Sequence, residues 1–248
     1  MKSVPKPEIV PAGEGESSAL IKQLMGYVAE RRLRAGDRLP SERDLAEQFG
    51  VGRNAIREAV TSLQTLRLVE RRPNSGLYLL AEQEHGSLDA ILLHSDLGIP
   101  MNEEEVGEVV ELRRMLEMQA VTLACERHRP EHVARLDAAL RLGAEALATG
   151  RNFAAADEAF HLSVVDAAGN RLFRRLVNSF YLFTRKRRVH YFENGERAPL
   201  SHAQHMALRD AIVARDVARA TAVMGGHLQA LGSYWLTLIG RPQKDMEP

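Results

Sequence analysis

The chain has 248 residues, of which 45% are hydrophobic, 27% charged and only 5% aromatic, an ordinary composition for a globular protein large enough for two modest domains. So few aromatic residues argue against binding of single-stranded nucleic acid by base stacking, and the single cysteine, Cys125, excludes an internal disulfide. No apolar run approaches the ~20 residues of a membrane-spanning helix, and the N-terminus lacks a signal-peptide pattern. We therefore expect a cytoplasmic protein with no membrane partner.

The net charge is +0, but the charges are unevenly distributed. Residues 1–80 contain 13 Lys and Arg against 10 Asp and Glu, and the remaining residues contain 20 against 23. A slightly basic first third attached to an acidic body suits a DNA-binding head, although so small an excess does not establish one.

Two short helices are predicted between residues 38 and 66. Ser41 is placed to accept a hydrogen bond from the N–H of Asp44 and so to start the first helix, which Gly50 ends. The second helix is predicted from Asn54 to Leu66, because apolar residues recur on one face and basic residues stay on the other. Two such helices joined by a glycine-containing turn are typical of a helix-turn-helix that enters the major groove of DNA.

A small β wing is predicted directly after these helices. Strands are expected at Leu68–Arg71 and Leu77–Leu80, and the Pro, Asn, Ser and Gly of residues 73–76 favour a turn between them.

The segment resembles the winged helix-turn-helix of the GntR family of bacterial transcription regulators. The resemblance lies in LPSERDLAEQFGV at residues 39–51, in the R-x-x-x-R-E-A motif of residues 53–59, and in the strand that leads to Gly76. It implies contacts with double-stranded DNA by residues of both helices and of the wing tip, namely Arg43, Arg53, Asn54, Arg57 and Gly76. For the arginines, the alternative is an ordinary solvated helix face. Gly52 and Ala55 depart from the family pattern, which often has Ser or Thr there for phosphate contacts.

The rest of the chain has helical periodicity and no strand alternation. Helices are expected at residues 17–33, 88–97, 102–128, 130–148, 152–166, 171–191, 199–215 and 216–239. The expected fold class is mainly α, with an N-terminal winged helix-turn-helix followed by an all-α bundle of six or seven helices. The predicted divisions are a disordered lead (1–15), a DNA-binding domain (16–80), a linker (81–87), an effector-binding and dimerisation domain (88–240) and a tail (241–248).

One polar constellation is prominent in the helical region. Asp157 and His161 are four residues apart, so they project from the same helix face, and His205 and His227 lie on two later helices. The glycines at 225 and 226 leave room for a close approach beside His227. Three imidazoles and a carboxylate suit a transition metal, while the alternative is a set of hydrogen-bonded core histidines. His202 is the competing candidate ligand.

The basic run at residues 185–188 and the remaining histidines are not expected to belong to a site. The RKRR run at residues 185–188 is expected to be a solvated face or a contact between domains. The histidines outside the constellation are expected to be exposed: His85, His94, His128, His132, His190 and His202.

The helical region resembles the FCD effector domain of the FadR-like branch of GntR regulators. The matching motifs are Asp157-x-x-x-His161, His205-x-x-Leu-x-x-Ala-Ile, His227-Leu and the R-x-x-L-E that runs from Arg113 to Glu117. The resemblance implies a divalent metal held by Asp157, His161, His205 and His227, with zinc, nickel and manganese all compatible. It also implies a small carboxylate effector bound by the metal and by Arg113, for which the alternative is a plain ion pair with Glu117.

The sequence thus predicts a homodimeric, ligand-responsive transcription regulator, more often a repressor in this family, that binds a pseudo-palindromic operator. Two alternatives remain open. In the first, the bundle is a mononuclear metalloenzyme acting on a small carboxylic acid, although no spare acid or base is recognisable beside the four ligands. In the second, the metal is purely structural.

Overall fold

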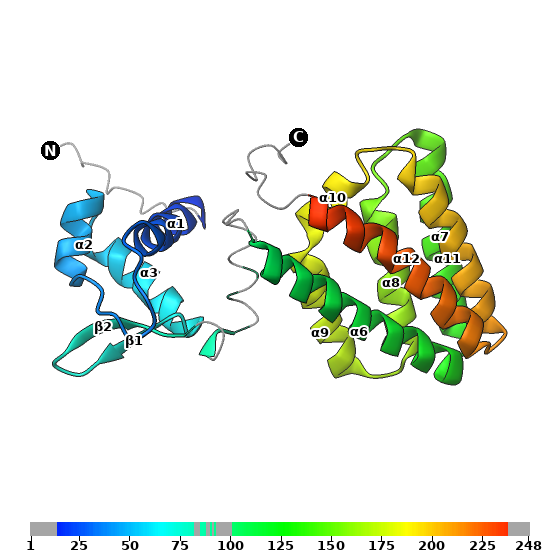
Figure 1. Ribbon diagram of the computed structural model, residues 1–248, viewed down its shortest axis with the longest axis horizontal. Helices are drawn as coiled ribbons and strands as arrows, with labels where there is room; N and C mark the ends of the chain where they lie inside the picture. The colour runs from blue at the N-terminus through cyan, green and yellow to red at the C-terminus, as the bar shows by residue number, and fades with distance from the viewer. Residues whose placement is uncertain (1–13, 82–84, 88–89, 91, 93–100, 238–248) are drawn as a thin grey trace, which may run out of the picture. The chain divides into compact units, whose positions relative to one another are not determined.

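A computed structural model of the chain describes residues 14–81, 85–87, 90, 92 and 101–237 (Figure 1). The chain divides into two compact units, Met1–Leu97 and Gly98–Pro248. The tail at residues 241–248 and most of the helix expected at residues 88–97 lie outside the described residues. Among the described helices, none is long and apolar enough to cross a membrane.

Residues 14–81 of the first unit form three helices and a two-stranded antiparallel sheet, in an order that matches a winged helix-turn-helix (Figure 1). The elements are α1 (Glu14–Glu30), α2 (Glu42–Phe49), α3 (Arg53–Thr65), β1 (Val69–Arg72) and β2 (Gly76–Leu79). The strands pair in the register Val69 with Leu79 and Arg72 with Gly76. Fully buried side chains of α2 and α3, such as Leu45, Ile56 and Val60, form part of the core of this unit.

The turn chemistry expected from the sequence sets the limits of α2. Ser41 Oγ accepts a hydrogen bond from the Asp44 N–H at 3.2 Å, and Gly50 takes the left-handed conformation at φ 67° that ends the helix. Helix α1 begins and ends three residues earlier than predicted, and Arg32, with φ 53°, already lies outside it. The start of α1 at Glu14 therefore overlaps the end of the lead expected to be disordered, whose residues 1–13 lie outside the described part of the chain.

The second unit is a bundle of seven described helices (Figure 1). They are α6 (Glu103–Arg127), α7 (Pro130–Thr149), α8 (Ala154–Ala167), α9 (Arg171–Phe183), α10 (Arg185–Tyr191), α11 (Arg197–Val213) and α12 (Val217–Thr237). Helix α8 packs against α6, α7, α9, α10 and α11, and α12 packs against α6 and α11. Because α8 has neighbours on several sides, it is rich in alanine and other apolar residues around much of its circumference.

The bundle begins where the sequence predicted, whereas one of the predicted helices is divided in two. Asn102 forms a complete capping box with Glu105 at the start of α6, as the asparagine and the acidic run suggested. The single helix predicted at residues 171–191 is wrong, because the chain breaks at Thr184 into α9 and α10. The break is stabilised by Arg188 Nη1, which donates to the Tyr181 carbonyl at 2.8 Å and to Thr184 Oγ1 at 2.7 Å.

Candidate metal centre and nucleic-acid interface

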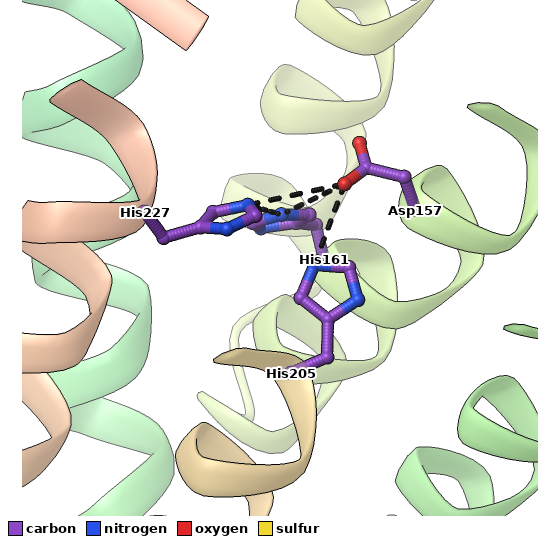
Figure 2. Close-up of side chains that lie close together, drawn as sticks. All are labelled: Asp157, His161, His205 and His227. Carbon is purple, nitrogen blue, oxygen red and sulfur yellow. Dashed lines mark hydrogen bonds and ion pairs between the residues drawn. The ribbon is translucent and has the colours of Figure 1, made fainter. Parts of the chain in front are cut away.

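Four polar side chains from three helices meet inside the bundle (Figure 2). Asp157 and His161 lie one turn apart on α8, His205 comes from α11 and His227 from α12. All four are buried, with exposed fractions between 0% and 6%. The structure therefore brings together the four residues that the spacing and the family resemblance singled out, and places them in the core rather than at the surface.

The side chains point their nitrogen and oxygen atoms at a common centre (Figure 2). The Nε2 atoms of His205, His161 and His227 lie 3.4, 3.6 and 3.9 Å from Asp157 Oδ1. The Nε2 atoms of His161 and His227 are 3.0 Å apart, and all four donor atoms lie within 4.8 Å of one another. Metal bonds of about 2.0–2.2 Å place neighbouring ligand atoms roughly 3 Å apart and opposite ones roughly 4 Å apart. The cluster is thus consistent with a metal site.

The outer nitrogens of two of the histidines face acceptor oxygens. His161 Nδ1 lies 3.1 Å from Oε2 of Glu117 on α6, and His227 Nδ1 lies 2.8 Å from Oε1 of Gln204 on α11. Because an amide oxygen can only accept, Nδ1 of His227 carries the hydrogen, whereas Nδ1 of His161 lies within ion-pair distance of the Glu117 carboxylate. Nε2 of His227 then presents a lone pair to the centre, and Nε2 of His161 does so once its proton is released, as metal binding requires.

Without a metal, the cluster has an unusual electrostatic balance. Burial would lower the pKa of His161, but the carboxylates of Glu117 and Asp157 outweigh it and raise this pKa to about 9. Burial lowers the pKa of His205 to about 4 and that of His227 well below its usual range. Against the effect of burial, the neighbouring His161 and His205 hold the pKa of Asp157 well below its usual range. At neutral pH His161 is therefore the protonated histidine of the cluster, and its positive charge lies beside the Asp157 carboxylate and the neutral rings of His205 and His227.

Two residues beside the cluster were missed as site components in the sequence. Glu117 was considered only as a partner of Arg113, yet it contacts His161 and also accepts a hydrogen bond from the Tyr181 hydroxyl. Glu117 is therefore a carboxylate beside the four ligands that no recognisable spacing in the sequence indicated. The position of Glu117 inside the buried stripe of α6 was the available signal, whereas nothing in the sequence pointed to Tyr181 on α9.

Arg113 is 4% exposed and lies next to these groups. Its Nε is 3.7 Å from Glu117 Oε1, and its Nη2 donates to the Tyr181 hydroxyl at 3.3 Å. The ion pair considered from the sequence is thus present. Even so, Nε and Nη1 have no hydrogen-bond partner among the described residues. A buried guanidinium with free N–H groups retains capacity to bind an anion.

The RKRR run is only partly the solvated face that we expected. Arg185 and Lys186 are exposed, but Arg187 and Arg188 are buried. Arg188 pairs with Glu158, and its Nε lies 4.0 Å from Asp157 Oδ2, so it belongs to the surroundings of the cluster.

The histidines outside the cluster are mostly less exposed than the sequence suggested. His132 is buried, and its Nδ1 accepts a hydrogen bond from the Arg129 N–H at the start of α7. His85 is exposed as expected, and His94 lies outside the described residues. The others are half-buried: His128, His190 and His202.

Two expectations about packing near the cluster also change. His202 packs near Gly143, where its Nδ1 would lie 2.7 Å from an added Cβ, and it is not one of the four clustered residues. Gly225 and Gly226 have nothing within 4 Å of an added Cβ, so the close approach expected beside them does not occur. The close approach on α12 occurs at Gly232, where an added Cβ would lie 2.8 Å from a side-chain carbon of α6.

The candidate DNA-contacting residues lie at the surface of the first unit. Arg43 is exposed on α2, and Arg53, Asn54 and Arg57 are exposed at the N-terminal end of α3. This end of a recognition helix is the part that approaches base edges in a helix-turn-helix. Arg57 does not extend freely, because its Nε lies 3.1 Å from Glu42 Oε2.

Gly76 begins β2 at the turn of the wing. Its φ of 127° is one that residues with a side chain rarely adopt, and an added Cβ would lie 2.9 Å from Arg38 Nε. Glycine is therefore required here by the fold itself, in addition to any approach to DNA. Arg38, an exposed arginine with no role expected from the sequence, lies against this turn.

Comparison with known proteins agrees with this architecture. Residues 17–79 match the family model described as "Bacterial regulatory proteins, gntR family", and residues 108–230 match the FCD domain. The transcriptional regulator LutR of Bacillus subtilis is 32% identical over 201 residues, which cover 79% of this chain and 90% of LutR. The transcriptional repressor NanR of Cronobacter sakazakii is 28% identical over 233 residues, which cover 90% of this chain and 86% of NanR.

A solved structure of Lar, which controls expression of the Listeria monocytogenes agr system, has a TM-score of 0.61 at 16% identity. The match covers 89% of this chain and 97% of that chain, and at this identity it supports the fold alone. The sequence matches go further, because they cover most of the chain and most of the regulators concerned. The chain belongs to the GntR family of bacterial transcriptional regulators, with an N-terminal helix-turn-helix and a C-terminal FCD domain.

Proposed function

We propose that this regulator is a homodimeric repressor whose bundle binds a divalent transition metal and a small carboxylate effector, and that the effector changes affinity for a pseudo-palindromic operator. Zinc, nickel and manganese all suit the donor set of three imidazoles and one carboxylate. The proposed metal ligands are Asp157, His161, His205 and His227. The proposed DNA contacts are Arg43, Arg53, Asn54, Arg57 and Gly76, and Arg113 is the proposed effector anchor.

The observation that carries the proposal is the convergence of acceptor atoms in the core. Nε2 of His161 and Nε2 of His227 face each other at 3.0 Å and share the neighbourhood of Asp157 Oδ1. In the metal-free protein the proton on Nε2 of charged His161 lies between these two nitrogens, and a bound metal would displace it. A bound metal would satisfy them together, and it would supply a Lewis-acidic position open to a carboxylate oxygen.

The surroundings of the cluster support an anionic ligand. Arg113 and Arg188 are both buried and lie over the Tyr181 ring, at 5.7 and 4.5 Å from its centroid. Glu117 and Glu158 offset part of their charge. With a divalent metal present, the positive charges outnumber the carboxylates, so the site favours a negatively charged guest. The free N–H groups of Arg113 would pair with its carboxylate through charge-assisted hydrogen bonds.

Two further observations support the repressor and dimer parts of the proposal. The relatives named NanR are repressors, and the named relatives are regulators rather than enzymes, so the metalloenzyme alternative gains no support. Large apolar side chains remain exposed on α6 and α9, which suits burial against a second copy. They are Leu112, Met115, Leu172, Leu176 and Leu182.

The test is a DNA-binding titration with the full chain. A duplex is first selected from a randomised library, and its affinity is measured with glycolate, succinate, gluconate or octanoate, each with and without chelator. The proposal expects one acid class to shift the affinity by ~5- to 150-fold, only in the metal-loaded protein. An acid that acts equally well after chelation would show that the metal is not part of the effector site. No response to any acid class, with tightly bound metal, would favour a purely structural metal.

A further inference from the structure

The carboxylate of Glu42 links three elements of the DNA-binding head. Glu42 is the first residue of α2, and its Oε2 lies 3.1 Å from Nε of Arg57 on α3. Its other oxygen, Oε1, accepts a hydrogen bond from Nη2 of Arg71 on wing strand β1. The start of α2, the recognition helix and the wing are therefore joined through one side chain.

The contact with Glu42 leaves the two terminal nitrogens of the Arg57 guanidinium free. Glu42 occupies only Nε, and Nη1 and Nη2 of Arg57 make no hydrogen bond to any residue that the structure describes. The Arg57 side chain is 65% exposed, whereas that of Glu42 is 17% exposed, so Arg57 is far more accessible to DNA than the carboxylate that it contacts. The two terminal nitrogens are the pair that binds O6 and N7 of a guanine.

The same contact also has an electrostatic cost for DNA binding. A carboxylate near the DNA-facing arginines reduces their net charge and repels phosphates, so on charge alone its removal should tighten binding to any duplex. Fixing a flexible arginine before binding acts in the opposite direction, because less rotamer freedom is lost when the complex forms. These two effects make opposite predictions for substitution of Glu42, which makes its role testable.

We propose that Glu42 is a positioning residue for operator recognition, which orients Arg57 toward a base edge and holds the wing to the recognition helix through Arg71. This inference rests on the proposed role of Arg57 in DNA contact. Burial would raise the pKa of Glu42, but the hydrogen bonds from Arg71 and Arg57 outweigh it and lower this pKa, so the carboxylate is ionised at neutral pH.

The experiment compares the full-length protein with Glu42→Gln and with a charge-matched control, Glu58→Gln. Glu58 follows Arg57 on α3, is exposed, and forms no ion pair within the described part of the chain. Affinities are measured for a duplex selected from a randomised library and for a scrambled duplex of the same composition. The readout is the ratio of the two affinities at fixed salt, and unfolding midpoints verify that the variants are folded.

The proposal expects Glu42→Gln to lower the selected-to-scrambled ratio by about tenfold, the usual size of one lost base contact. Glu58→Gln should leave the ratio unchanged while raising both affinities. In an Arg57→Ala background, Glu42→Gln should cause a smaller further loss, because only the link to Arg71 then remains to be removed. Glu42→Asp retains the charge but shortens the reach, so it should also lower the ratio, and it serves if Glu42→Gln is poorly folded.

Three outcomes would overturn the inference, and they are distinguishable. If Glu42→Gln tightens both duplexes equally, as the control does, Glu42 acts only through its charge. If Arg57→Ala lowers the ratio but Glu42→Gln and Glu42→Asp do not, the DNA contact stands and the positioning role fails. If Arg57→Ala leaves the ratio unchanged, the proposed DNA contact itself is wrong, and the role of Glu42 falls with it.

Discussion

Glu117 Oε2 lies 3.1 Å from Nδ1 of His161, so a carboxylate of α6 lies directly against a histidine of α8. With Nδ1 on the Glu117 side, Nε2 of the same ring faces Asp157 and His227. The contact with Glu117 also contributes to the raised pKa of His161 in the metal-free protein. Glu117 therefore links the R-x-x-L-E motif of α6 to the candidate metal centre.

Substitution of Glu117 tests that link. Glu117→Gln keeps the size of the side chain but removes its charge, so metal affinity should fall by roughly 10- to 100-fold, as for other partners of metal-binding histidines. Competition with a chromophoric chelator measures the affinity. Glu111→Gln, an exposed change on the same helix, is the control and should have no effect. Equal metal affinity in Glu117→Gln and the native protein would contradict the role assigned to Glu117.

The pKa values of the cluster predict how the stability of chelated protein depends on pH. His161 has a folded pKa of about 9. Its contribution to stability is complete below its unfolded pKa of about 6.5 and is lost as the pH rises from there through 9. His205 has a folded pKa of about 4, so its contribution is lost as the pH falls from about 6.5 through 4.

The two histidines therefore oppose each other, and the melting temperature of the chelated protein should peak near neutral pH. Differential scanning calorimetry from about pH 4 to about pH 9.5, which spans both folded pKa values, measures this profile. In the His161→Gln variant the decline on the alkaline side should be reduced. A chelated native protein that grows steadily more stable up to about pH 9 would be incompatible with a protonated His161.

Arg113 should matter for the effector but not for the metal. Arg113→Lys retains the positive charge and loses the planar fork, so stabilisation of the protein by its carboxylate ligand should weaken by about tenfold or more. Thermal shift against ligand concentration measures this loss, and elemental analysis should show unchanged metal. The neighbouring Arg114→Lys, an exposed change, is the control. A loss of metal in Arg113→Lys would show that Arg113 supports the metal centre itself.

Arg188 should be important for stability. It is 1% exposed, and it holds Glu158, Thr184 Oγ1 and the Tyr181 carbonyl at the break between α9 and α10. Arg188→Met would leave a partly buried carboxylate and a helix-end carbonyl without their partner, which should cost about 3–5 kcal/mol. Urea unfolding measures the change. Arg185→Met, at an exposed position of the same helix, should change stability by less than about 0.5 kcal/mol.

Local chemistry made much of the fold predictable. Ser41, Gly50 and Asn102 start or end helices through contacts within four residues, and each behaves as its sequence context indicated. The break at Thr184 was not predictable in this way. It depends on Arg188 reaching back to Tyr181, in a segment whose helical periodicity continues on both sides.

The candidate metal centre was predictable for a different reason. Asp157 and His161 share a helix face by spacing, His205 and His227 were grouped with them by residue type and expected burial, and the family resemblance then favoured this set of four. The residues that surround the same centre come from three other helices, and their proximity depends on how α6, α9 and α10 pack against α8. No short-range pattern in the chain encodes that packing. These residues are Glu117, Tyr181 and Arg188.

The contact between Glu42 and Arg57 was missed for the same reason. The two residues are fifteen positions apart, on separate helices, and each is typical of an exposed helix position when it is read alone. Their pairing depends on the turn that sets α2 against α3.

Metal content of the purified native protein, measured by elemental analysis without chelators, tests the central claim most directly. The account predicts about one zinc, nickel or manganese ion per chain, since four ligands from one bundle form one site. His205→Ala should lose this metal, while His202→Ala, three residues earlier on α11, should keep it. Native protein that contains no metal, or His205→Ala that binds it as tightly as the native chain, would contradict the proposed metal centre.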